Sequence, residues 1–345
     1  MQHRLSRRTL ALASTATIFS SFGILRARAD EPMRLRCSLD TAPSHLRNVA
    51  VADYLKKLEA KSGGRIKTEI FHSGQLFADL DVSKALIQGQ VEMAAPGVWT
   101  LTGFVPNADM LQLPAMYGRT LEETHRVVDG RAGALVNAEV EKKLRVHMLP
   151  GSIDLGFQNW YTSKKALGSA ADLQGLKIRS PGGAGTSWRI RFFGGIPNVT
   201  AWPNVPLALS QGTFDGLVST NQSLATGKLW EAGVRHAYED HQFFGAYLPM
   251  VSNVFWDKLP ADLQTTMTDL WTQNIPAYRA GMEKAQADSR AILQANGVSF
   301  VDPTKDVVVA ARKSMMKQQD EMAREIKVSP EMVQLVMQDL GVSSS

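Results

Sequence analysis

The feature that most constrains the fold is an alternation of strand and helix patterns that occurs twice along the chain. Residues 35–94 alternate short apolar strand patterns with runs of apolar residues at helical spacing, and residues 176–218 repeat that order. Parallel strands need a crossover connection, usually a helix, so this order is typical of parallel sheets covered by helices. The sequence therefore predicts two α/β units.

The length of the chain also favours two domains. At 345 residues it exceeds the size, about 250–300 residues, at which one hydrophobic core stops growing. Residues 260–296 have a helical pattern long enough to brace both units, and Pro276 within it should kink the helix. A last amphipathic helix is expected over residues 304–326.

The first 29 residues have the composition of a secretion signal. They carry five arginines, no acidic residue, an apolar run and an Ala-Arg-Ala cleavage sequence that ends at Ala29. Arg7 and Arg8 before the apolar run resemble a twin-arginine signal, but Leu10 replaces the usual phenylalanine, which leaves the Sec route open. We expect cleavage near Ala29 and export to the periplasm.

The charge of the remaining chain argues against a nucleic-acid partner. The whole sequence has 38 basic and 33 acidic residues, and removal of the five signal arginines leaves 33 of each. A neutral chain lacks the sequence-independent attraction on which nucleic-acid binders depend. The single cysteine, Cys37, excludes an intrachain disulfide.

No sequence pattern supports catalysis. The chain has no G-x-S-x-G elbow, no H-E-x-x-H pair and no Walker loop, and its one cysteine has no neighbouring histidine. No D-x-D-x-D calcium loop occurs either. We therefore expect a protein that is not an enzyme and holds no cofactor or metal.

Five segments, spread over the chain in a fixed order, point to a family. They are KSGGRI (61–66), FHSGQL (71–76), ALIQGQVEMA (85–94), DLQGLKIRSP (172–181) and PLALSQGTFDG (206–216). Together they resemble the DctP-type solute-binding proteins of tripartite ATP-independent periplasmic (TRAP) transporters.

The resemblance implies a periplasmic-binding-protein-like α/β fold, with two α/β domains, a ligand cleft between them and a long helix bracing both. Domain I is expected at 30–155 plus about 248–285, and domain II at 156–247 plus about 286–340. The implied partners are a small organic acid anion and the small and large integral membrane subunits of a TRAP permease. Dimers occur in the family, which leaves a homodimer open.

The resemblance also implies ligand-binding residues. Arg179 matches the arginine that pairs with the ligand carboxylate, and a guanidinium suits that role because it offers two parallel donors to two oxygens. Asn221 matches an asparagine that donates to the same carboxylate. Trp202 and Trp99 are expected to supply apolar walls. The alternatives are a surface ion pair for Arg179, a turn for Asn221 and core packing for the tryptophans.

One position departs from the family pattern. Many members carry an arginine about 20 residues before the central arginine, whereas this chain has Gln158 there. The pocket would lose one cation, which favours a monocarboxylate with an aromatic, hydroxy or sugar-acid body over a dicarboxylate. Two rival functions remain: a ligand-binding partner of a membrane sensor kinase, and a periplasmic enzyme acting on an organic acid, with Glu92 or Asp154 as its base.

Overall fold

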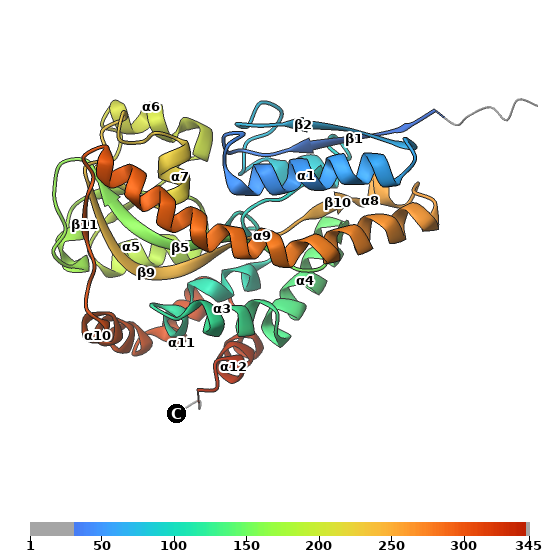
Figure 1. Cartoon of the computed structure of the whole chain (residues 1–345). Coiled ribbons are helices and arrows are strands. Elements are labelled where there is room, and N and C mark those ends of the chain that lie inside the picture. The colour runs from blue at the N-terminus through green and yellow to red at the C-terminus, as the bar shows by residue number, and fades with distance from the viewer. Residues whose placement is uncertain (1–30, 343–345) are drawn as a thin grey trace, which may run out of the picture. The chain divides into compact units, whose positions relative to one another are not determined.

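The computed structural model describes residues 31–342, which form two β-sheets with helices packed around them (Figure 1). The predicted secretion signal, residues 1–29, lies outside the described residues. No helix within residues 31–342 is long and apolar enough to span a membrane.

The first sheet has five strands in the order β2-β1-β3-β10-β4. Its strands are β1 (Met33–Ser38), β2 (Ile66–Phe71), β3 (Met93–Ala94), β4 (Val146–Met148) and β10 (Met250–Ser252). Strands β1, β2 and β3 are parallel, and β10 runs antiparallel to β3 and β4. Leu35 and Cys37 of β1 are fully buried, as expected for a strand covered by a helix.

The second sheet has six strands in the order β11-β9-β5-β8-β6-β7. They are β5 (Ile153–Thr162), β6 (Lys177–Ser180), β7 (Ile196–Val199), β8 (Gly216–Ser219), β9 (His236–Tyr247) and β11 (Ser299–Val301). Strands β7, β6 and β8 are parallel, whereas β5 runs antiparallel to both β8 and β9. The two α/β units predicted from the sequence are therefore confirmed.

The chain passes between the two sheets on neighbouring strands. Strand β4 ends at Met148 and β5 of the other sheet begins at Ile153, while β9 ends at Tyr247 and β10 begins at Met250. Because β5 and β9 pair with each other, both passages lie side by side. The sheets are thus joined by two neighbouring connections, from β4 to β5 and from β9 to β10.

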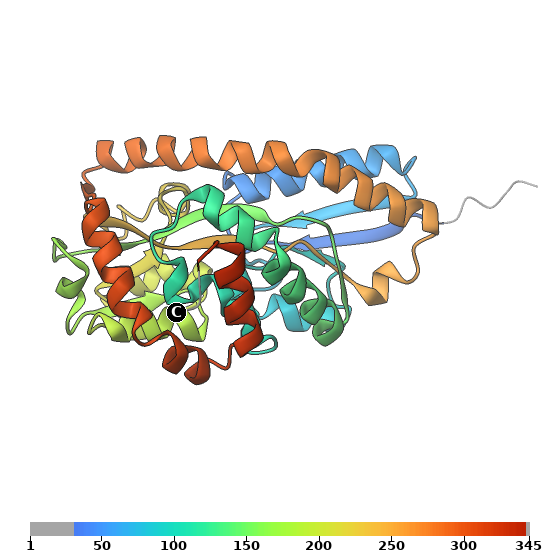
Figure 2. The ribbon, with the colours of Figure 1, turned by 90° about the horizontal axis from the view of Figure 1, so that it is seen from below.

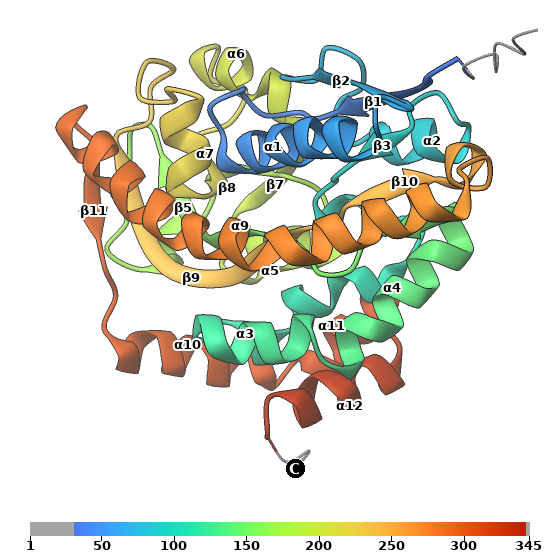
Figure 3. The ribbon, with the colours of Figure 1, turned by 45° about the vertical axis from the view of Figure 1, so that its right-hand side comes forward.

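The long helix α9 (Ala261–Ala295) spans both parts of the molecule (Figures 1 and 3). It packs on α1 (Leu46–Lys61) beside the first sheet and on α7 (Asn221–Thr226) beside the second. Buried residues of α9 include Leu263, Met267 and Leu270, which recur at helical spacing. The helix continues through Pro276, and Figure 2 shows that it bends along its length.

The remaining helices cover the sheets and the lower part of the molecule in Figure 1. They are α2 (Val82–Ile87), α3 (Leu121–Val128), α4 (Arg131–Leu144), α5 (Ala184–Phe192), α6 (Val205–Ser210), α8 (Asn253–Trp256), α10 (Lys305–Met316), α11 (Gln319–Glu325) and α12 (Pro330–Asp339). Short 3-10 turns connect several of them.

The C-terminal helices differ from the sequence-based expectation. The single helix expected over 304–326 is wrong, because the chain leaves the helical path at Gln318 and forms α10 and α11. The backbone N–H of Ala115 donates to the side-chain oxygen of Gln319 at 2.9 Å, a tertiary contact that the sequence does not signal. Helix α12, which packs on α4, was not predicted.

Candidate ligand-binding site

Arg179 lies at the end of β6, with its side chain buried between the two parts of the molecule. Arg179 is only 2% exposed to solvent. Its Nε donates to the carbonyl oxygen of Thr200 at 2.9 Å and its Nη1 to that of Val218 at 3.3 Å. These backbone acceptors fix the plane of the guanidinium group, and the ring centroid of Trp202 lies 5.6 Å from its central carbon.

Arg179 is a buried cation without a close anion. Among residues 31–342 it forms no ion pair with a carboxylate, and Asp79 and Asp40 act on it only through the longer-range Coulomb interaction. Burial lowers the pKa of Arg179 to about 10, an effect that the two carboxylates oppose. The side chain therefore stays charged at neutral pH, in surroundings where a bound anion would interact strongly with it.

Asp79 reaches the site from the other part of the molecule. It precedes α2, and its carboxylate oxygens accept from the backbone N–H of Trp202 at 3.3 and 3.4 Å. Burial, and next the nearby charge of Asp40, raise the pKa of Asp79 to about 7, which Arg179 partly opposes. Asp79 and Trp202 thus form a contact between the two parts of the molecule.

A second buried arginine stands beside this contact. Arg47 of α1 is 1% exposed, forms an ion pair with Asp40 and donates to Thr41 Oγ1 at 2.8 Å. Its guanidinium carbon lies 4.0 Å from the ring centroid of Tyr247. Because Asp40 already neutralises Arg47, Arg179 is the one of these two arginines without a close carboxylate within the described residues.

Two of the other residues expected to bind the ligand, Trp99 and Gln158, each carry a buried donor without an acceptor. Trp99 is 6% exposed and Gln158 is 2% exposed, and neither Trp99 Nε1 nor Gln158 Nε2 has a hydrogen-bond partner in the described range. Such atoms cost free energy unless something accepts their protons. The ring of Trp99 lies 5.7 Å from that of Tyr247 and packs on the turn after β6, where a Cβ on Gly182 would lie 3.6 Å from Trp99 Cδ1.

Asn221 is placed differently from the other expected ligand residues. Its Oδ1 accepts from the hydroxyl of Tyr161 at 2.8 Å, and its Nδ2 donates to Glu239 Oε1 at 2.5 Å. Both polar atoms are therefore engaged with protein groups. The side chain lines a hollow under α9 rather than contacting the guanidinium of Arg179.

The structure therefore gathers Arg179, Trp202 and Trp99 around Tyr247 and Asp79, with Gln158 two strands away from β6 on β5. The sequence-based reasoning did not identify Asp79, Arg47 or Tyr247 as part of this site. It missed as well the hydrogen bond at 3.3 Å between His45 Nε2 and Ser223 Oγ, which also joins the two parts of the molecule.

Comparison with known families decides the class of protein. Residues 38–326 match the family described as bacterial extracellular solute-binding protein, family 7 (DctP). The chain belongs to this family. Members of the DctP family are non-enzymatic solute-binding proteins of transport systems.

Relatives support the same assignment over nearly the whole chain. The C4-dicarboxylate-binding periplasmic protein DctP of Rhodobacter capsulatus is 27% identical over 334 residues, which cover 93% of this chain and 96% of that protein. The sialic acid-binding periplasmic protein SiaP of Vibrio cholerae is 22% identical over 76% of this chain and 81% of that protein.

Solved structures of DctP-family proteins have the same fold. The sugar acid binding protein of Advenella mimigardefordensis, in complex with galactonate, has a TM-score of 0.84 at 18% identity and covers 90% of this chain and 98% of its own. A TRAP solute-binding protein of Sulfurospirillum deleyianum with bound succinate has a TM-score of 0.81 at 22% identity, covering 88% and 98%. The predicted two-domain fold is thereby confirmed.

Proposed function

We propose that this DctP-family protein captures an organic acid anion between its two domains, with Arg179 as the carboxylate-binding residue. The observation that carries the proposal is a buried, charged guanidinium that has no ion pair with a carboxylate among residues 31–342. A buried cation needs a counter-charge, and a ligand carboxylate would supply one. The relatives whose names or complexes mention dicarboxylate, sialic acid, galactonate and succinate all involve carboxylic acids.

The unpartnered donors extend the proposed site beyond Arg179. Trp99 Nε1 and Gln158 Nε2 can only donate, so a ligand that satisfies them must present acceptor oxygens. Trp202 would cover the apolar part of the ligand beside the guanidinium. Both polar atoms of the Asn221 amide already bond to protein groups, so contact with the ligand would require the amide to give up its bond to Glu239 or Tyr161. We therefore propose that Asn221 supports the site without being its main carboxylate donor.

The neutral amide of Gln158 favours a monocarboxylate. Arg47, which lies close to Tyr247 beside Trp99, is already paired with Asp40 and is therefore not free for a second ligand carboxylate. We infer an acid with an aromatic, hydroxy or sugar-acid body. The domain boundaries stay as predicted, near 155, 248 and 285, and the cleft between the domains would close on the ligand.

The proposed destination of the ligand is a TRAP permease with a small and a large membrane subunit, reached in the periplasm after removal of residues 1–29. The alternative in the same compartment is a membrane sensor kinase. Growth on the identified acid after deletion of the gene distinguishes the two, because loss of growth indicates uptake and unchanged growth with lost gene induction indicates sensing.

A thermal-shift screen of residues 30–345 tests the capture of an acid. Aromatic, hydroxy, keto, dicarboxylic and sugar acids are compared on the wild type and on Arg179→Ala, with the exposed Arg191→Ala as matched control. A ligand at a hundred times its Kd adds about 2.7 kcal/mol to the free energy of unfolding, which gives a clear rise in Tm. We expect one class of monocarboxylic acid to raise Tm in the wild type and the control only.

Two results would overturn this proposal. If an acid still raises Tm in Arg179→Ala, Arg179 does not bind its carboxylate. If only neutral or cationic solutes raise Tm, the ligand is not an organic acid anion. If Arg179→Ala does not fold, Arg179→Lys serves, since lysine keeps the charge but loses the bidentate geometry and should bind more weakly.

A further inference from the structure

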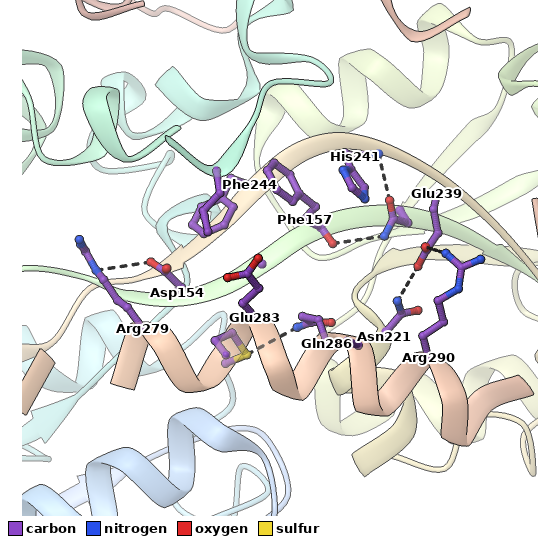
Figure 4. A pocket seen from close by; sticks show the side chains of 15 residues that line it. Asp154, Phe157, Asn221, Glu239, His241, Phe244, Arg279, Glu283, Gln286 and Arg290 are labelled. Carbon is purple, nitrogen blue, oxygen red and sulfur yellow. Dashed lines mark hydrogen bonds and ion pairs between the residues drawn. The ribbon is translucent and has the colours of Figure 1, made fainter. Parts of the chain in front are cut away.

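A hollow of about 270 Å³ lies between helix α9 and the paired strands β5 and β9 (Figure 4). Phe157 and Asn159 of β5 line it, whereas Gln158 between them does not. This is the alternation expected of a strand, whose successive side chains point to opposite faces. The hollow, here called the rear cavity, is therefore separate from the Gln158 side of the sheet.

We propose that the rear cavity is a second binding site, which takes a small organic cation with an apolar body such as a single ring. It is formed by Asp154, Phe157, Glu239, Phe244, Glu283 and Arg290, among others. Its volume is just below the range of about 300–1,000 Å³ typical of pockets for drug-sized ligands, so a fragment with one ring would fill it.

Aromatic side chains form one wall of the rear cavity. The rings of Phe157 and His241 are stacked, with centroids 4.6 Å apart and planes within 8°. The ring of Phe244 meets that of Phe157 edge-on at 5.2 Å. Burial lowers the pKa of His241, so this imidazole is neutral at pH 7 and does not repel a cation. Rings of this kind attract ammonium groups through their electron-rich faces.

Acidic side chains outnumber basic ones around the rear cavity. Five carboxylates lie in it or directly beside it, those of Asp129, Asp154, Glu239, Glu283 and Asp302. Only two guanidinium groups oppose them. Arg279 is held by both oxygens of Asp129, and Arg290 by both oxygens of Asp302 and by Glu239. Asp129 and Asp302, which do not line the cavity, therefore neutralise much of the arginines' positive charge. Less positive charge is left to balance the carboxylates that do line the cavity.

Asp154 supplies a buried acceptor that lacks a donor. Its side chain is 4% exposed, its Oδ2 contacts His125 Nε2 at 2.8 Å, and its Oδ1 has no hydrogen-bond partner within residues 31–342. Arg279 Nε lies 3.5 Å from Oδ1 but donates to the carbonyl oxygen of Ser152 at 2.9 Å. An ammonium group has three N–H donors and can satisfy such an oxygen.

Glu283 completes the acidic side from the opposite wall. Figure 4 shows its carboxylate extending from α9 toward the strands that carry Asp154 and Phe244. The residue is exposed and forms no ion pair in the described part of the chain. It can therefore meet a cation that enters from solvent without first giving up another partner.

Calorimetry with benzylamine tests the rear cavity, using residues 30–345 in phosphate buffer so that no buffer amine competes. We expect benzylamine to bind and benzyl alcohol, its neutral analogue, not to bind measurably. Glu283→Arg should weaken the binding of benzylamine by roughly tenfold. Asp269→Arg, which reverses the charge at an exposed position of α9 outside the cavity, should leave this binding unaltered. Asp154→Asn should weaken it by tenfold or more.

The Arg179→Ala variant separates this site from the anion site, since it should bind benzylamine as the wild type does. The proposal is wrong if the wild type does not bind benzylamine at millimolar concentration, or if benzyl alcohol binds equally well. It is also wrong if neither Glu283→Arg nor Asp154→Asn weakens binding, or if binding is lost in Arg179→Ala. Glu283 is exposed, so its variant tests the site even if Asp154→Asn does not fold.

Discussion

Trp99 carries a single hydrogen-bond donor, and that donor is buried without an acceptor among residues 31–342. A buried N–H that lacks a partner destabilises the ligand-free protein by about 1–3 kcal/mol. A ligand oxygen placed against it would recover this energy on binding. Trp99 Nε1 thus lowers the stability of the ligand-free protein and favours ligand binding.

The substitution Trp99→Phe tests whether Trp99 Nε1 donates to an oxygen of the ligand. Phenylalanine removes the unpaired Nε1, which favours folding, but its ring is smaller than the indole, which costs packing against Tyr247. These effects oppose each other, so thermal unfolding of the ligand-free variant should occur at a Tm close to that of the wild type. The affinity for the acid found in the screen should fall by about three- to tenfold, measured by calorimetry. Trp188→Phe is the control on a buried indole of α5. Equal affinity in wild type and Trp99→Phe would place Nε1 outside the ligand contacts.

At the scale of elements, α12 shows how a short C-terminal helix is held. Its first residue is Pro330, and Ser329 before it accepts from the backbone N–H of Met332 at 3.1 Å. Pro at the first helical position and Ser as N-cap are favourable because they fit the N–H groups that have no helical partner. The backbone N–H of Ser329 donates to Asn107 Oδ1 at 2.8 Å, which ties the helix to the body of the protein.

Loss of the cap should destabilise this element measurably. In Ser329→Ala the side-chain acceptor is removed and the backbone contact to Asn107 is kept, so we expect a loss of about 1 kcal/mol. For a protein of this size that lowers Tm by roughly 2 °C in a thermal melt. Ser210→Ala, which removes an exposed hydroxyl at the end of α6, should leave Tm unaltered. Equal melting of both variants would show that the cap contributes nothing.

At the scale of the whole molecule, the titratable side chains of Asp79 and His45 both take part in hydrogen bonds between the two parts. Asp79 accepts from the backbone of Trp202, and His45 contacts Ser223. Burial raises the pKa of Asp79 to about 7 and, together with Arg47, lowers the pKa of His45 well below its usual value. The folded structure therefore favours a protonated Asp79 and a neutral His45.

The pH dependence of stability should reveal Asp79. An unfolded aspartate ionises near pH 4 and the buried one near 7, so its contribution is full below pH 4 and is lost as pH rises to about 7. Asp79→Asn cannot ionise and keeps an acceptor for Trp202. Its Tm relative to wild type should therefore rise between pH 5 and pH 8. Asp269→Asn, on the exposed face of α9, should show no such trend, and a flat difference for Asp79→Asn would contradict the raised pKa.

Much of the architecture could be predicted because it depends on local patterns. Apolar residues at helical spacing predicted α9 within one residue at each end, and the strand-helix alternation predicted both α/β units. The central motif led to Arg179, because a strand followed by a glycine-rich turn repeats a family pattern. By contrast, the break at Gln318 was missed, since the contact of Gln319 with Ala115 joins residues 204 positions apart. The start of α12 was also missed, although Ser329 before Pro330 is a local helix-start signal.

The sequence by itself thus determined the family, the two α/β domains and the arginine proposed to bind the ligand, because each is encoded in a contiguous segment. Only the tertiary structure decided which groups surround Arg179 and which face the rear cavity. Asp79, Tyr247 and Trp99 come from separate segments that meet only when the two sheets face each other. Asn221 is expected to donate to the ligand carboxylate, and in this structure its amide bonds to Tyr161 and Glu239, contacts that the sequence does not signal.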